Sequence, residues 1–107
     1  MGLAASQAVY RCREAAAGFF NLDNPSNVIF VQNCTMALNI VIKGLLNNGG
    51  RVIVSDLEHN AVMRPLHALS PHKPVYDFAR VTPGNTQATV EAFRTCIKPD
   101  TRAIICL

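Results

Sequence analysis

The chain has 107 residues, a length that corresponds to at most one domain. Half of the residues are hydrophobic, but no apolar run approaches the roughly 20 residues of a membrane span, so a membrane protein is not expected. The formal net charge is +3, and the lysines and arginines are scattered singly, which argues against a nucleic-acid-binding protein.

The cysteines of the chain form no CxxC pair, and each lies among apolar neighbours in the sequence. This pattern predicts reduced, buried thiols in a cytoplasmic protein and no metal site. The four residues concerned are Cys12, Cys34, Cys96 and Cys106.

The first half of the chain begins with a predicted helix over residues 3–20, where apolar residues recur at helical spacing. A turn at 21–27 and a short strand at 28–31 are expected to follow. The next predicted helix, residues 35–46, is apolar nearly all round, so we expect it to be buried on most sides. Asn and Gly residues at 47–50 end it, because they tolerate the left-handed cap.

The second half alternates strands with helices. Residues 51–55 have an unbroken apolar centre, which is typical of a strand covered on both faces. The remaining expected elements are a helix at 60–69 bent by Pro65, a connector at 70–74, a strand at 75–81, a helix at 86–97 and a strand at 102–107. Such alternation predicts an α/β fold with a mostly parallel sheet and helices outside it.

The final predicted strand, residues 102–107, remains apolar up to its last residue. A natural domain rarely ends on an unprotected apolar strand, because such a strand is an aggregation hazard. From this pattern we expect the chain to be a fragment.

Two predicted strand-to-helix junctions carry the polar residues of most interest, and one contains Cys34 and Thr35 while the other contains Glu58 and His59. In an open α/β sheet, ligands bind at the carboxyl ends of the strands. A helix N-terminus there offers free N–H groups and a positive dipole to an anion. The first junction is therefore interpreted as a phosphate site, with His59 beside it. From the residues alone, Thr35 also fits a plain N-cap, and His59 a partly buried helix-capping histidine without a ligand.

Residues 28–46 followed by 51–69 resemble the cofactor-binding segment of class V aminotransferases, and within them the cysteine desulfurase and selenocysteine lyase branch. Residues 100–105 are similar to a later strand of that family. The resemblance implies an α/β fold: part of the three-layer α/β/α sandwich of a fold-type-I large domain, with a mostly parallel sheet. It also implies a single partial domain over residues 1–107, truncated at both ends.

The same resemblance implies pyridoxal 5′-phosphate as the cofactor. The backbone N–H groups of Cys34 and Thr35, with the Thr35 hydroxyl, would hold its phosphate. His59 would stack on its pyridine ring and act as the catalytic residue that relays a proton. The implied parent activity converts L-cysteine to L-alanine and an enzyme persulfide, in a cytoplasmic homodimer that takes a small amino-acid substrate.

The chain also departs from the family. The family uses a lysine that forms a Schiff base with the cofactor, and none of Lys43, Lys73 and Lys98 has that context. Asp77 is interpreted as a solvated residue rather than the partner of the pyridine nitrogen. We therefore expect the chain alone to be inactive. Two alternatives remain open: another class V aminotransferase or lyase, and a non-catalytic remnant that acts as a structural or partner-binding module.

The resemblance also predicts the order of the strands. The strand at 51–55 should lie between those at 75–81 and 102–107, while the strand at 28–31 should be unpaired. Sequentially adjacent parallel strands are usually neighbours, so this order is a discriminating expectation. It would expose apolar surface on the last strand and on the helix at 35–46.

Overall fold

The computed structural model describes residues 2–69 and 74–106, so His72 and Lys73, in the expected connector, lie outside the described residues. The chain forms two compact units, Met1–Gln32 and Asn33–Leu107. The first unit contains helix α1 (Leu3–Phe19) and a short 3₁₀ helix, η1 (Pro25–Asn27), which packs against it. Asn24 caps η1, since its Oδ1 accepts a hydrogen bond from the Ser26 N–H at 2.9 Å.

The strand expected at residues 28–31 is absent from this part of the described chain, so that prediction is wrong. Val28 does have extended backbone, with φ −93° and ψ 120°. β-branched residues favour such backbone, but a strand also needs a neighbour to pair with. The segment pairs with no strand of the described residues, which agrees with the expected strand order.

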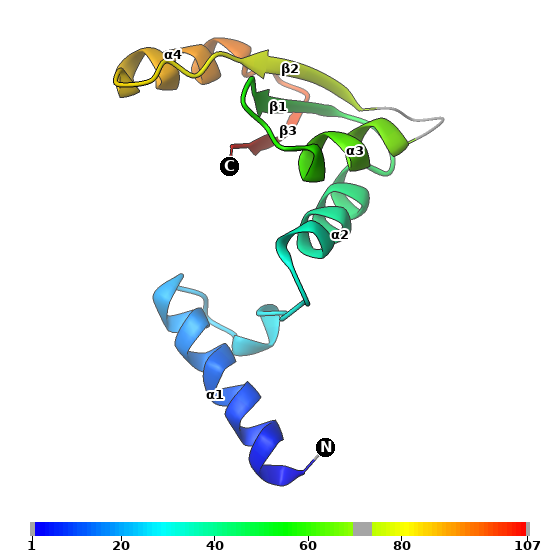
Figure 1. The fold of residues 1–107 in the computed structure, drawn as a ribbon, viewed down its shortest axis with the longest axis vertical. Coiled ribbons are helices and arrows are strands. Elements are labelled where there is room, and N and C mark those ends of the chain that lie inside the picture. The colour runs from blue at the N-terminus through cyan, green and yellow to red at the C-terminus, as the bar shows by residue number, and fades with distance from the viewer. Residues whose placement is uncertain (1, 70–73, 107) are drawn as a thin grey trace. The chain divides into compact units, whose positions relative to one another are not determined.

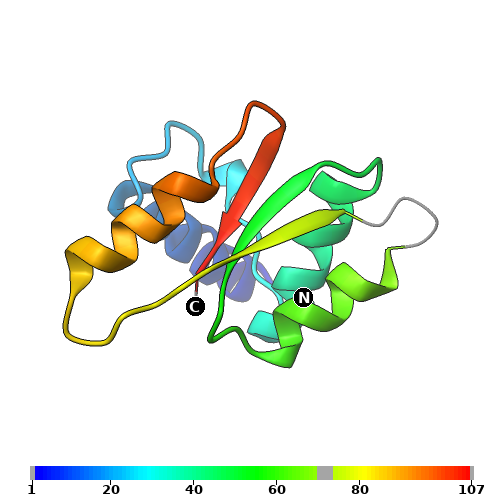
Figure 2. The ribbon, with the colours of Figure 1, turned by 90° about the horizontal axis from the view of Figure 1, so that it is seen from above.

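The second unit contains helices α2 (Cys34–Leu46), α3 (Asn60–Ala68) and α4 (Thr86–Cys96) and strands β1 (Arg51–Ser55), β2 (Val75–Ala79) and β3 (Thr101–Ile105). The strands form a parallel sheet in the order β2-β1-β3, which confirms the expected position of the 51–55 strand in the centre. Helices α2 and α3 lie on one side of this sheet and α4 on the other (Figures 1 and 2). The fold class is therefore α/β with a three-stranded parallel sheet.

The main hydrophobic core lies between the sheet and the α2–α3 pair. It consists of Ile42, Leu46, Val52, Val54, Val62 and Leu66, all at most 1% exposed. Ile53 is also fully buried, and as the residue between Val52 and Val54 it faces the opposite side of the strand. The central strand is thus covered on both faces, as its unbroken apolar run predicted.

The burial expected for α2 and for the cysteines is only partly present. On α2, Ile42 and Leu46 are buried, but Val41 and Leu45 are each 53% exposed, so the prediction of burial on most sides is wrong. Ile104 of β3 is 52% exposed, which confirms the apolar surface expected on α2 and β3. The described chain simply has too few layers to cover these faces. The prediction of buried thiols is also wrong: Cys12, Cys34 and Cys106 are exposed and Cys96 is partly exposed.

An ion-pair cluster links the first residue of β1 to the middle of β2 and to the segment just before β3. Arg51 Nη1 lies 2.7 Å from Asp77 Oδ2, and Arg51 Nε lies 3.1 Å from Asp100 Oδ1. Lys98 Nζ lies 3.8 Å from Asp77 Oδ2. The hydrogen bond that Arg51 donates to Asp77, and next the one that it donates to Asp100, raise the pKa of Arg51. Asp77 is therefore a paired residue, and its interpretation as solvated is wrong.

The described residues include no group of three or more His, Cys, Asp or Glu side chains that could hold a metal ion. Nor does any helix within them have the length and apolarity required to cross a bilayer.

Candidate functional site

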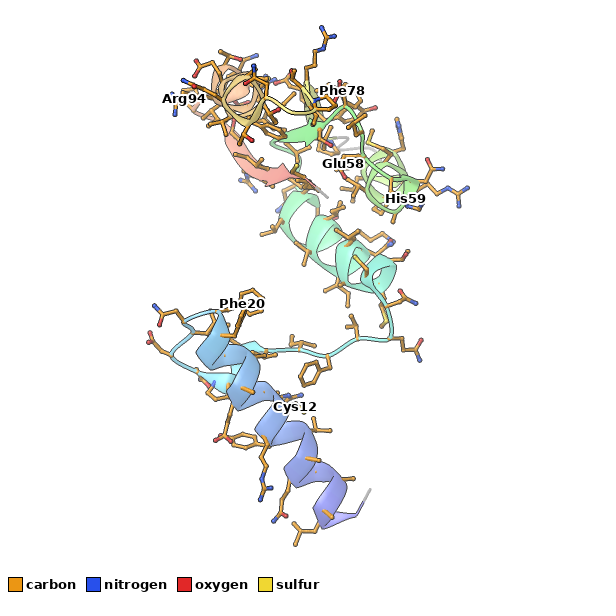
Figure 3. The ribbon with its side chains drawn as sticks, turned by 60° about the vertical axis from the view of Figure 1, so that its left-hand side comes forward. Cys12, Phe20, Glu58, His59, Phe78 and Arg94 are labelled. Atoms are coloured by element: carbon orange, nitrogen blue, oxygen red, sulfur yellow. The ribbon has the colours of Figure 1, made fainter. Side chains whose placement is uncertain are left out.

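Two hydrogen bonds that involve side chains of residues 55–58 hold the loop after β1 in place. The buried Ser55 hydroxyl donates to Glu58 Oε1 at 2.6 Å, so Glu58 supports this junction. Asp56 Oδ1 accepts from the Val81 N–H at 2.9 Å, which ties the loop to the end of β2. Together these bonds fix the backbone that leads directly into α3 and presents His59 (Figure 3).

The N-terminus of α2 is capped by Asn33. Its Oδ1 accepts a hydrogen bond from the Met36 N–H at 2.8 Å. Thr35 is therefore the second residue of the helix, and the interpretation of Thr35 as the N-cap is wrong. The N–H groups of Cys34 and Thr35 are in the first turn, where no intrahelical acceptor exists. Two backbone donors and the positive end of the helix dipole thus remain available beside the Thr35 hydroxyl.

His59 is the N-cap of α3. Its ring Nδ1 accepts a hydrogen bond from the Ala61 N–H at 3.1 Å, while the side chain is exposed. A ring nitrogen that accepts carries no proton, so the neutral ring carries its proton on Nε2. The capping role expected from sequence is real, but it uses only Nδ1. The exposed ring therefore lines the cleft while its Nε2 takes no part in the cap.

A cleft of about 370 Å³ between α2 and α3 brings the two junctions together. Thr35 and Asn39 of α2 line one side, and the α3 segment contributes His59, Asn60, Ala61, Arg64, Pro65 and Ala68. Thr35 and His59, both predicted from sequence, therefore share one cavity. Cys34, also predicted from sequence, is not among the described residues that line the cleft.

Sequence analysis did not single out Asn39, Asn60 and Arg64, which also line the cleft. Asn39 Nδ2 donates to the Thr35 carbonyl at 2.9 Å, so it stabilises the first turn of α2. The signal for these residues was helical spacing: Asn39 follows Thr35 by four positions, and Arg64 follows Asn60 by four. Residues at that spacing lie on one helix face.

The cleft suits a phosphorylated aromatic group. Free backbone N–H groups and a hydroxyl meet the needs of a phosphate, and the exposed imidazole offers a flat face to a ring. The fold and this cleft define an α/β domain whose cleft includes His59, in the loop that follows the carboxyl end of β1, and ligand sites in such folds usually lie at that end of the strands.

The chain belongs to the aminotransferase class-V family, whose model matches residues 1–106. Among curated proteins, the cysteine desulfurase IscS of Acinetobacter baumannii is 26% identical over 104 residues, which is 94% of this chain and 25% of that protein. A probable cysteine desulfurase of Pseudomonas putida is 30% identical over 78 residues, or 70% of this chain and 20% of that protein.

Two solved structures of the protein C-DES match nearly the whole chain. A complex of the cystine C–S lyase C-DES with its reaction product, cysteine persulfide, has a TM-score of 0.74 at 25% identity. A C-DES mutant with glycine covalently linked to the PLP cofactor has a TM-score of 0.71 at 24% identity. Each match covers 99% of this chain and 29% of C-DES. The chain thus spans about a quarter of the length of the relatives it matches.

Proposed function

We propose that this chain is the part of a pyridoxal-phosphate-dependent, cysteine desulfurase-like enzyme that supplies the phosphate site and the ring-stacking histidine. The observation that carries the proposal is that Thr35 and His59 line the same cleft. The family and the desulfurase names of its relatives support the class of chemistry. When bound, the cofactor withdraws electrons from the bond that breaks in the amino-acid substrate.

Different residues of the chain would contact the phosphate and the pyridine ring of the cofactor. The N–H groups of Cys34 and Thr35 and the Thr35 hydroxyl donate hydrogen bonds to the phosphate, which is also favoured by the α2 dipole. The imidazole of His59 would stack on the pyridine ring and orient it. Its Nε2, which the cap does not use, could hold and exchange a proton during turnover.

Neither described lysine is placed to bind the cofactor covalently. Lys43 is an exposed residue of α2 that does not line the cleft. Lys98 lies 3.8 Å from Asp77, near the amino-terminal ends of the strands. Because the covalent lysine is essential to the chemistry of the family, we propose that the 107-residue chain alone does not turn over substrate.

The family also supports a proposal for the whole protein. We infer a cytoplasmic homodimer that converts L-cysteine to L-alanine and an enzyme persulfide. A second candidate, C–S lyase activity on cystine, is favoured by the structural match to C-DES. The product distinguishes them: a desulfurase leaves alanine and protein-bound sulfur, whereas the reaction product of C-DES is cysteine persulfide.

The proposed site is tested by titrating the 107-residue chain with pyridoxine 5′-phosphate, which has no aldehyde and forms no lysine adducts. We expect saturable binding, followed by ligand fluorescence, and weaker binding of pyridoxine, which lacks the phosphate. Equal affinity for the two ligands would reject the phosphate site, and absence of binding to either would reject the proposed cofactor role.

A further inference from the structure

Arg64 is a charged residue of the cleft that the proposed function does not use. It lies on α3 five positions after His59 and is exposed. None of the ion pairs among the described residues includes it, whereas Arg51 and Arg94 both have carboxylate partners. Its guanidinium is therefore available to a ligand of the cleft without breaking an internal salt bridge.

The lining of the cleft favours an anionic ligand. No Asp or Glu is among the described residues that form it, so no carboxylate there competes for the guanidinium. The lining does include other hydrogen-bond donors: the Thr35 hydroxyl, the Asn60 amide and the Nε2–H of His59. A guanidinium presents a planar set of donors that matches the oxygen atoms of a phosphate or a carboxylate.

We propose that Arg64 is a binding residue for an oxyanion in this cleft, acting from α3 while Thr35 acts from α2. The assignment of that oxyanion to the cofactor or substrate rests on the proposed function, whereas the site itself rests on the lining of the cleft. Along the helix axis, the backbone of Arg64 lies about 7.5 Å beyond that of His59. A long arginine side chain can cover this distance toward the phosphate of a cofactor, or it can bind the carboxylate of a substrate further along the cleft.

The test is an NMR titration of the ¹⁵N-labelled 107-residue chain with inorganic phosphate, acetate, pyridoxine 5′-phosphate and pyridoxine. The variants are Arg64→Met and Arg64→Lys, with Arg80→Met as a charge-matched control. Arg80 is exposed and does not line the cleft. We expect Arg64→Met to weaken phosphate binding about tenfold, the effect of one charge-assisted hydrogen bond, with Arg64→Lys intermediate and Arg80→Met unchanged.

The probes identify the source of the oxyanion. Weaker binding of phosphate and pyridoxine 5′-phosphate by Arg64→Met, with acetate unaffected, assigns Arg64 to the cofactor phosphate. The reverse pattern assigns it to a substrate carboxylate. An amide spectrum that superposes on that of the unsubstituted chain shows that a variant is folded. If Arg64→Met does not fold, the affinities of Arg64→Lys are compared instead.

Two further outcomes separate this inference from the proposed function. Unchanged affinities in Arg64→Met, or an Arg64 side-chain signal that responds to no probe, overturn the inference, even if pyridoxine 5′-phosphate still binds. A second outcome is that phosphate binding depends on Arg64 while the chain binds the pyridine ligands no better than free phosphate. This outcome supports the oxyanion site and rejects the cofactor role.

Discussion

The ring Nδ1 of His59 lies 3.1 Å from the backbone nitrogen of Ala61, so one histidine both caps α3 and lines the cleft. The cap needs an acceptor atom at a fixed position, whereas stacking needs a flat ring. These requirements are chemically different, and a pair of substitutions can therefore separate them.

We predict that His59→Asn keeps α3 stable but weakens cofactor binding. Asparagine is among the best N-cap residues, so the free energy of unfolding should stay within about 0.5 kcal/mol of the unsubstituted chain. The flat imidazole is lost, so the affinity for pyridoxine 5′-phosphate should fall about tenfold. Urea unfolding and ligand fluorescence measure the two quantities.

The complementary variant, His59→Phe, should show the opposite pattern. Phenylalanine keeps a flat ring but cannot accept a hydrogen bond, so we expect a loss of about 1 kcal/mol in stability with much of the affinity retained. If both variants bind the ligand as well as the unsubstituted chain, His59 is only a helix cap and the stacking role must be abandoned.

The α2 junction allows a similar separation. Thr35→Val removes a hydroxyl that does not cap the helix, so we expect near-normal stability and about tenfold weaker phosphate binding. Asn33→Ala removes the cap that accepts from Met36 and should lower stability by about 1 kcal/mol. A Thr35→Val variant with normal phosphate affinity would limit the site to the backbone N–H groups.

The chain incubated with pyridoxal 5′-phosphate, L-cysteine and a reductant should release no sulfide above the background of the free cofactor. The reason is that neither described lysine lines the cleft. Sulfide is measured by methylene blue formation, with heat-denatured chain as the control. Release that depends on the folded chain, or a borohydride-stable adduct at a single lysine, would contradict the prediction.

The exposed apolar face of α2 should make the chain self-associate. Val41 is 53% exposed and should contribute to that contact. In sedimentation velocity, Val41→Lys should shift the chain toward monomer. Gln87→Lys adds the same charge at an exposed polar position of α4 and should leave association unchanged. A monomeric unsubstituted chain at tens of micromolar would show that the exposed face is tolerated.

Two glycine substitutions should have opposite effects on stability. Gly50 has φ +114°, and an added Cβ would lie 2.6 Å from Arg102 Cδ, so Gly50→Ala should cost about 1–3 kcal/mol. Gly44 lies inside α2 with nothing within 4 Å of an added Cβ, so Gly44→Ala should stabilise the chain by up to about 1 kcal/mol. Urea unfolding compares the two variants, and a destabilised Gly44→Ala would contradict the described packing of α2.

The residue pattern and the family resemblance together predicted most of the second unit. Alternating strands and helices indicated the parallel sheet, but its order came from the resemblance, since nothing local to Thr101–Ile105 shows that β3 pairs with β1. The error at residues 28–31 has the same origin. Local preference for extended backbone is visible in a sequence, whereas the presence of a neighbouring strand is not.

The site was predicted to a similar extent. Thr35 and His59 were found because they follow recognisable junctions, while Arg64 and Asn39 join the site only through the packing of α3 against α2. Asn33 rather than Thr35 caps α2, and both residue types cap helices well, so the sequence did not separate them. The helical pattern alone predicted a buried α2, because an apolar face looks the same in a sequence whether or not another layer covers it, and the exposure of α2 was expected only from the strand order that the resemblance implied.

The central position of β1 has a consequence for synthesis on the ribosome. Arg51 pairs with Val75 on one side and with Thr101 on the other, so β1 is synthesised before either of the two strands that pair with it. At typical rates of translation, the segment from Arg51 to Thr101 takes on the order of several seconds to emerge. During that interval an apolar strand has an open edge, which makes the nascent chain a natural client for chaperones.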